Sequence, residues 1–161
     1  MKSVKLSELI EALEFDFEEI RALVDLENGC VVKVQRSVLS DVEVGDEEAL
    51  SDVPDWQKDE VEIARAIVED LGTRFISPLD KHEFHEYGQM ERFIETVRNA
   101  GAADQLWRAI KGKGAFRHFK DTADRLGLLN QWFQYRDNAM KEFVVDWAED
   151  NNVPYEDDVK D

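Results

Sequence analysis

The spacing of apolar residues near the N-terminus predicts a short helix followed by a β-hairpin. Apolar positions three or four residues apart, typical of an amphipathic helix that covers a sheet face, run through roughly the first fifteen residues: Leu6, Leu9, Ile10 and Leu13. Two apolar runs, Ile20–Leu26 and Cys30–Gln35, then flank Asn28-Gly29. Because Asn-Gly readily adopts the positive φ angles of a tight turn, these runs predict an antiparallel hairpin. Asp25 is expected to shape that turn by bonding to nearby backbone groups.

Helical periodicity dominates the rest of the chain. A helix is expected from near Trp56 to Gly72, and residues 74–77 read as a third strand. Later apolar stripes predict helices over residues 80–99, from beyond Gly101 through Ile110, over 116–127 and over 132–147. The predicted fold class is α+β, with a small antiparallel sheet (the N-terminal hairpin plus one strand) packed against a mainly helical C-terminal half.

The length of 161 residues favours one domain, which we expect over residues 1–150. Residues 151–161 are acidic and contain Pro154, which interrupts helices, so they are expected to form a frayed tail. Neither an internal repeat nor a Gly/Ser-rich linker divides the sequence.

Charge narrows the classes of partner. The chain carries 20 Lys and Arg against 37 Asp and Glu, a net charge of −17. Such a surface repels phosphate backbones and anionic lipid headgroups, so we expect a protein partner rather than a nucleic acid or a membrane. The sequence has no leader-like or membrane-spanning apolar run, and its single cysteine, Cys30, reads as a small buried hydrophobe. A bacterial-type cytoplasm is the expected location, and the oligomeric state stays open.

Residues 41–62 concentrate the negative charge, with ten acidic residues and one lysine. A solvated loop that leads into a helix accounts for this density, because carboxylates are favoured in the first turn of a helix. The alternative interpretation is an electrostatic docking surface for a basic partner.

The charge reverses between Arg108 and Arg125, where six basic residues stand against two acidic ones, with His118 in addition. Here Lys111-Gly112-Lys113-Gly114 falls where one helix ends and the next begins, so free N–H groups and ammonium groups can converge on an anion. The spacing of a nucleotide-binding P-loop is absent. Alternatively, the glycines only turn the chain and the cations pair with the protein's own carboxylates. The candidate anion- or partner-binding residues are Arg108, Lys111, Gly112, Lys113, Gly114, Arg117 and Lys120.

The segment Arg108–Asp121 resembles the central signature of an uncharacterised bacterial protein family, number zero-one-five-eight of the UPF series. The Asp25–Gly29 turn, the helix around Met90 and the start of the last helix at Trp132 are similar to that family as well. The departures lie mainly in residues 41–55 and in the tail. The resemblance implies a domain without an established molecular function and supplies no catalytic residues.

Catalytic chemistry is not assembled in the sequence. His82 and Glu86, four residues apart, can offer two metal ligands on one helix face, but a third ligand is missing, and we expect no metal or cofactor. The serines lack the turn that exposes a nucleophile. We therefore expect a cytosolic, non-enzymatic binding or regulatory module that docks a partner through the basic helix–turn–helix patch and the acidic loop. The alternative is a binder of, or an enzyme acting on, a small phosphorylated or carboxylated metabolite at the Gly-Lys-Gly turn, which requires a concave pocket there.

Overall fold

The computed structural model of the chain describes residues 1–15, 17–77 and 80–159. Contacts gather into two compact units, one within residues 1–79 and 144–160 and the other over Asp80–Phe143. One boundary falls inside the last helix, α9 (Leu129–Asp150). The α+β class is confirmed. A single domain over residues 1–150 is not tested by this division and stays a prediction.

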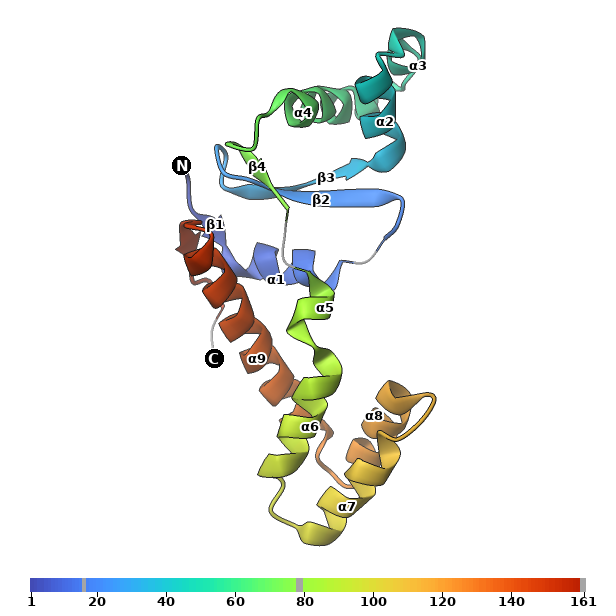
Figure 1. Cartoon of the computed structure of the whole chain (residues 1–161), viewed down its shortest axis with the longest axis vertical. Helices are drawn as coiled ribbons and strands as arrows, with labels where there is room; N and C mark the ends of the chain where they lie inside the picture. Colours follow the sequence, from blue (N-terminus) through green and yellow to red (C-terminus); the bar gives the residue numbers. More distant parts are fainter. Residues whose placement is uncertain (16, 78–79, 160–161) are drawn as a thin grey trace. The chain divides into compact units, whose positions relative to one another are not determined.

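The first unit is built on a three-stranded antiparallel sheet with the order β3–β2–β4 (Figure 1). The central strand β2 (Ile20–Asp25) pairs with β3 (Cys30–Gln35) on one side and with β4 (Phe75–Ile76) on the other. Both the predicted hairpin and the predicted third strand are thereby confirmed. The predicted N-terminal helix, α1 (Leu6–Glu14), lies on one face of the sheet, and α2 (Arg36–Val44) and α4 (Lys58–Glu69) lie on the opposite face (Figure 1).

The acidic segment is helical, which corrects the expectation of a loop. It runs through the end of α2 (Arg36–Val44), α3 (Glu47–Ser51), the 3-10 helix η1 (Asp55–Gln57) and the start of α4 (Lys58–Glu69). Asp46 caps α3 by accepting a hydrogen bond from the N–H of Ala49 at 3.2 Å. Buried apolar residues anchor these helices to the sheet: Val34, Val38, Leu39, Leu50, Val61 and Ala64. Most of the carboxylates lie on the solvent side, where their density hid this apolar stripe.

The predicted tail is held in place over its described part, residues 151–159, which corrects the expectation that it frays. Tyr155–Glu156 forms β5, which pairs in parallel with β1 (Val4–Lys5). Val153 is buried, and the Asp158 carboxylate accepts hydrogen bonds from the N–H and hydroxyl of Ser7. Burial and backbone pairing outweigh the acidic composition here; residues 160–161 lie outside the described part.

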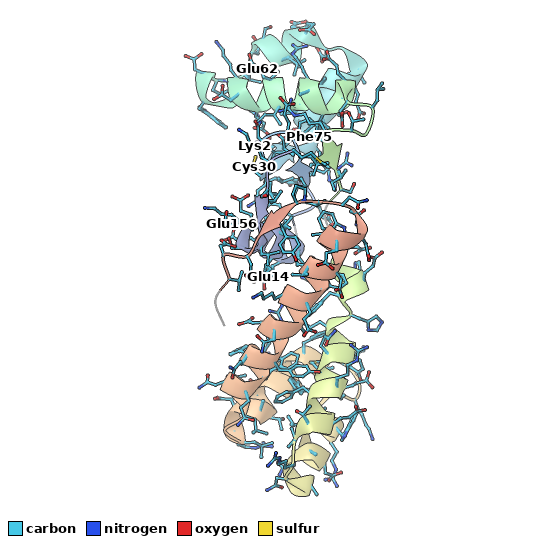
Figure 2. The ribbon with its side chains drawn as sticks, turned by 90° about the vertical axis from the view of Figure 1, so that its left-hand side faces the viewer. Lys2, Glu14, Cys30, Glu62, Phe75 and Glu156 are labelled. Carbon is cyan, nitrogen blue, oxygen red and sulfur yellow. The ribbon has the colours of Figure 1, made fainter. Side chains whose placement is uncertain are left out.

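Asp25 is a charged residue that is nevertheless buried, and it holds the hairpin turn, as predicted. Its Oδ1 atom accepts hydrogen bonds from the backbone N–H groups of Glu27 and Asn28 at 3.0 and 3.3 Å. The Arg74 guanidinium donates to both carboxylate oxygens, at 3.0 and 3.1 Å. Cys30 and Phe75, labelled in Figure 2, are its register partners on the two neighbouring strands. Asp25 therefore ties the turn to the segment that enters β4.

The second unit consists of short helices and the first part of α9. The helix predicted over residues 80–99 is two helices, α5 (Lys81–Phe84) and α6 (Glu86–Thr96), because His85 adopts a left-handed φ of 57° between them. The helix that follows, α7 (Ala100–Ala109), is capped by the Asn99 side chain, so Gly101 lies in its first turn rather than before it. The predicted third helix is confirmed as α8 (Ala115–Arg125).

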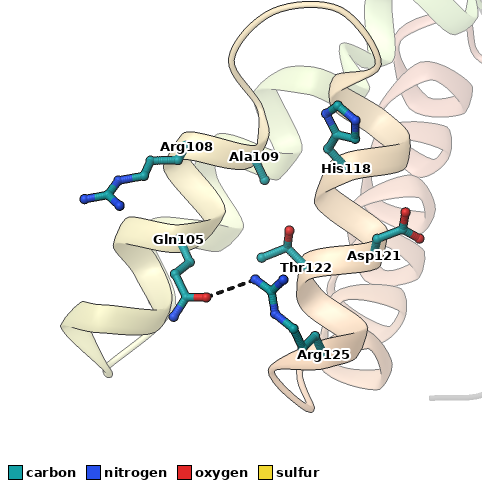
Figure 3. A pocket seen from close by; sticks show the side chains of 7 residues that line it. All are labelled: Gln105, Arg108, Ala109, His118, Asp121, Thr122 and Arg125. Carbon is teal, nitrogen blue, oxygen red and sulfur yellow. Dashed lines mark hydrogen bonds between the residues drawn. The ribbon is translucent and has the colours of Figure 1, made fainter.

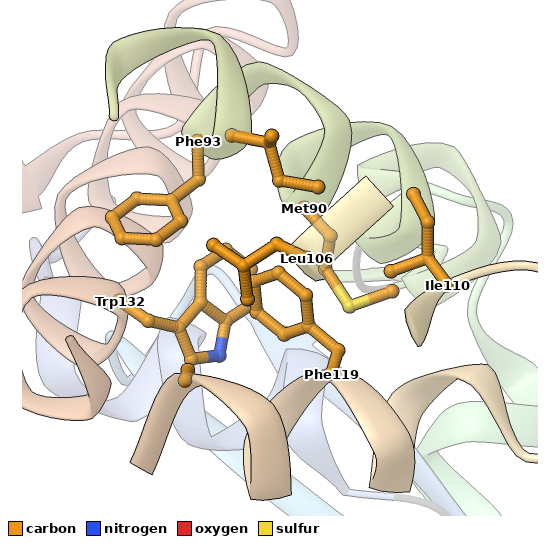
Figure 4. Packing of buried hydrophobic residues seen from close by; sticks show 8 residues of the cluster. Met90, Phe93, Leu106, Ile110, Phe119 and Trp132 are labelled. Carbon is orange, nitrogen blue, oxygen red and sulfur yellow. The ribbon is translucent and has the colours of Figure 1, made fainter. Parts of the chain in front are cut away.

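An apolar cluster joins α6, α7, α8 and α9 within this unit (Figure 4). Its buried members are Met90, Phe93, Ile94, Leu106, Ile110, Phe119, Ala123 and Trp132. The ring of Phe119 packs edge-to-face against Trp132 at 4.9 Å and against Phe93 at 6.2 Å between centroids. The Trp132 indole N–H has no acceptor among the described residues, so aromatic packing rather than a hydrogen bond positions this side chain.

Replacing Asp25 with Asn is expected to destabilise the protein. The change removes the buried carboxylate partner of Arg74 and leaves it only the exposed carboxylate of Glu27, 3.2 Å away. Because Arg74 is a third exposed, we expect about 2–3 kcal/mol, below the roughly 3–5 kcal/mol of a fully buried pair. Urea unfolding followed by circular dichroism measures this loss. The matched control, Asp52→Asn at an exposed position, is expected to stay within about 0.5 kcal/mol. Equal stabilities of the two variants would show that the ion pair contributes nothing.

Because of the Asp25–Arg74 ion pair, we expect the free energy of unfolding to decrease in acid. Burial by itself raises the pKa of Asp25. The hydrogen bonds and charge of Arg74 and the hydrogen bonds from Asn28 lower this pKa, and together they outweigh burial, so the pKa lies below the ordinary value of 3.8. The stabilisation is complete above that ordinary value and is lost as the pH falls through the lower pKa of the folded state. The difference in unfolding free energy between the wild type and Asp25→Asn is therefore expected to decrease below about pH 4. A difference that stays constant down to pH 2 would contradict this assignment.

Phe119 and Phe116, three residues apart on α8, make a matched pair for testing the helical cluster. Phe119 is buried and Phe116 is 46% exposed. Phe119→Ala leaves a cavity and is expected to cost about 3–5 kcal/mol of unfolding free energy, whereas Phe116→Ala is expected to cost less than about 1 kcal/mol. Thermal and urea unfolding check both values. The reverse order would mean that α8 is turned about its axis.

Candidate functional site

The predicted Gly-Lys-Gly segment forms the connection between α7 and α8. Ile110 is buried, and its carbonyl accepts a hydrogen bond from the Tyr87 hydroxyl at 3.0 Å, which anchors the start of the connection. Gly112 and Gly114 adopt φ angles of 84° and 74°, a conformation that costs other L-residues roughly 1–2 kcal/mol. Gly114 is the N-cap of α8 and offers no capping side chain. The turn therefore presents its residues to solvent and leaves the first N–H groups of α8 uncapped by a side chain.

All seven predicted site residues are exposed. Two of the arginines pair with acidic residues one helical turn away: Arg108 lies 2.8 Å from Asp104, and Arg117 lies 4.0 Å from Asp121. The ammonium groups of Lys111, Lys113 and Lys120 make no ion pair or hydrogen bond with any residue in the described ranges. Internal neutralisation, the alternative left open by the sequence, therefore applies to the arginines and not to the lysines.

The order of charges along the helices accounts for this difference. Asp104 precedes Arg108 by four residues, the order that favours an ion pair on a helix, and their distance is short. Arg117 precedes Asp121, the less favourable order, and the distance reaches 4.0 Å. Lys120 also precedes an acid, Asp124, and the two form no ion pair in the described structure. Lys111 and Lys113 have no acidic residue three or four positions away.

Phe116 adds an apolar side chain to this surface. It is 46% exposed, whereas Phe119, three residues later on α8, is fully buried. It lies one helical turn before Lys120 on α8, so these two side chains are neighbours on the helix surface, and Lys113 lies three residues earlier in the turn. We refer to Lys111, Lys113, Phe116 and Lys120 as the Lys/Phe surface.

A hollow of about 450 Å³ opens between α7 and α8 (Figure 3). Its lining residues are Gln105, Arg108, Ala109, His118, Asp121, Thr122 and Arg125. Of these, only Arg108 belongs to the predicted set, and neither Lys113 nor Gly114 lines the hollow. The metabolite-binding alternative requires a pocket at the Gly-Lys-Gly turn, whereas this hollow lies beside the turn. The spacing of residues 118, 122 and 125, which share one helix face, is the sequence signal that points to it.

The acidic segment also carries an exposed aromatic residue. Trp56 in η1 is 73% exposed. Several of the nearby acids are engaged within the chain: Glu47 binds Arg65 through two hydrogen bonds of 3.0 and 2.9 Å, and Asp55 lies 2.9 Å from Lys58. The hydrogen bonds from Arg65, followed by its charge, lower the pKa of Glu47.

The other sequence candidates are separated by the fold. The break at His85 places His82 and Glu86 on different helices, and Glu86 accepts a hydrogen bond from Arg136. Within the described ranges, no group of three or more His, Cys, Asp or Glu side chains is arranged to hold a metal. Cys30 is partly rather than fully buried; this burial, followed by the nearby carboxylates of Asp25 and Glu8, raises the pKa of its thiol. The thiol form is therefore favoured, which does not suit a nucleophile.

Among the described residues, no helix combines the length and apolar character that a membrane span needs.

Comparison with known proteins identifies the family of this chain. Over 67 residues the chain is 30% identical to the UPF0158 protein PA5073 of Pseudomonas aeruginosa, a match that covers 41% of this chain and 44% of that relative. No solved structure matches the chain. The model described as "Uncharacterised protein family (UPF0158)" matches residues 2–159, which confirms the resemblance seen in the sequence. The chain belongs to the uncharacterised protein family UPF0158.

Proposed function

We propose that this protein is a cytosolic, non-enzymatic binding or regulatory module, and that its Lys/Phe surface docks an acidic segment of a protein partner. The observation that carries the proposal is the unpaired state of Lys111, Lys113 and Lys120 among the described residues. In a chain with 37 acidic and 20 basic side chains, carboxylates are plentiful, yet these three ammonium groups remain available to an external anion.

Phe116 supports a protein partner over a lone anion. Interfaces gain most of their affinity from a few buried anchors, among which aromatic side chains are enriched, and a ring of polar contacts excludes water around them. Phe116 is 46% exposed, and contact with an apolar group of a partner would remove this ring from water at a gain in free energy. A partner segment that alternates carboxylates with an apolar residue satisfies both the lysines and the ring.

The net charge of −17 acts against an acidic partner at long range. Physiological salt limits this repulsion, because its screening length is about 8 Å and charges farther away are largely screened. A partner segment in contact with the surface is then attracted by the nearby lysines, while its repulsion by distant carboxylates is screened. We therefore expect the affinity for an acidic segment to be highest at intermediate salt and to fall at high salt.

The acidic helices around Trp56 form the second docking surface of the proposal. The charge of residues 41–62 and the exposed indole suit a partner segment that carries Lys or Arg, since a cation can lie over the indole face. Two surfaces of opposite charge, one on each compact unit, would orient a partner that bears both signs.

Charge reversal tests the Lys/Phe surface. The triple variant Lys111→Glu, Lys113→Glu, Lys120→Glu is expected to bind a fluorescein-labelled peptide of Glu and Leu at least tenfold more weakly than the wild type, because three attractive contacts become repulsive. Fluorescence anisotropy at about 150 mM salt measures the affinity.

The control variant makes the net charge of the same unit more negative by four, against six in the triple variant, without touching the surface. Arg92 and Arg98 are exposed on and just beyond α6, and the double variant Arg92→Glu, Arg98→Glu is expected to bind the peptide within twofold of the wild type. Equal losses in both variants would show that only net charge matters and would refute the proposed surface. Circular dichroism and urea unfolding confirm that each variant is folded.

A further inference from the structure

The hollow between α7 and α8 collects hydrogen-bond donors that the docking surface does not use. His118, Thr122 and Arg125 lie at positions i, i+4 and i+7 of α8 and therefore share one helix face. Gln105 and Ala109 line the hollow from α7 (Figure 3). An imidazole, a hydroxyl, a guanidinium and an amide thus border one small volume.

Arg125 is held in position for an incoming ligand. Its Nη2 atom donates a hydrogen bond to Oε1 of Gln105 at 3.0 Å, across the gap between the two helices. A guanidinium has five N–H donors in a planar fork, and this bond uses one of them. Because the side chain is already ordered by Gln105, less conformational entropy is lost when the remaining donors bind an oxyanion.

The other two charged residues that line the hollow, Arg108 and Asp121, each pair with a residue outside the lining. Arg108 is directed away from α8 and pairs with Asp104 at 2.8 Å (Figure 3). The Asp121 carboxylate is directed away from α7, and Arg117 lies 4.0 Å from it. Of the two arginines that line the hollow, Arg125 is the one directed across the gap between the helices, and the Asp121 charge is partly offset by Arg117.

We infer that this hollow binds a small molecule through a carboxylate or phosphoryl group. In this assignment the Arg125 fork donates to two of its oxygens, while Thr122 and His118 donate to the same group, and Ala109 contacts the apolar part of the molecule. The volume of about 450 Å³ falls within the roughly 300–1,000 Å³ of known small-molecule sites. This site lies apart from the three lysines of the docking surface, so it stands or falls independently of the proposed function.

Titration with inorganic phosphate and with acetate, each at constant ionic strength, tests the site in the full-length protein. Two-dimensional ¹H–¹⁵N NMR is expected to show saturable shifts centred on the amides of Gln105, Ala109, His118, Thr122 and Arg125. Arg125→Gln is expected to weaken binding at least tenfold, and Thr122→Val, which removes a hydroxyl at nearly constant volume, at least threefold.

Two control variants separate this site from general anion attraction. Arg98→Gln, an exposed cation elsewhere in the same unit, is expected to leave the affinity within twofold. The variant with all three lysines changed to Glu is expected to keep the same pattern of shifted amides. Saturation by phosphate alone assigns the site to phosphoryl groups, and saturation by acetate alone assigns it to carboxylates. Shifts that follow every exposed cation, the absence of saturable shifts with both anions, or unchanged affinity in Arg125→Gln would overturn the inference.

Discussion

The burial of Phe119 decides which side chains of α8 face solvent. Its ring is fully enclosed and packs edge-to-face against Phe93 and Trp132, and Ala123, one turn later, is buried as well. Because successive residues of a helix are turned by about 100°, fixing these two positions inward places Phe116 and Lys120 on one flank of the buried face. The same rotation turns residues 118, 122 and 125 toward α7. Both the Lys/Phe surface and the hollow therefore depend on the apolar cluster of the second unit.

Charge order along the helices then separates the available cations from the neutralised ones. An acid four residues before a base gives a close pair, as at Asp104 and Arg108, while the reverse order at Arg117 and Asp121 gives a looser one. The glycine-containing turn removes Lys111 and Lys113 from helical spacing altogether, so no helix neighbour can pair with them. A strongly acidic chain can in this way keep a small basic surface without losing it to its own carboxylates.

Short-range signals in the sequence were sufficient for the hairpin, the third strand and the basic turn. Asn28-Gly29 marked the turn, and the two lysines with two glycines marked the connection between α7 and α8. Contacts between distant residues were not predictable: Arg74 binds Asp25 across 49 positions, and β5 pairs with β1 across nearly the whole chain. The left-handed backbone at His85 was missed because such a conformation is uncommon outside glycine. The hollow was missed because it depends on how α7 and α8 face each other.

The most direct test of the account is lysine footprinting of the full-length protein in buffer and in a lysate of its source organism. Acetylation rates, read by mass spectrometry, are compared for Lys111, Lys113 and Lys120 against Lys58, whose partner is Asp55. If the Lys/Phe surface docks a partner, these three lysines become acetylated several-fold more slowly in the lysate while the rate at Lys58 changes little. Equal rates for the three lysines in buffer and in lysate would contradict the central claim.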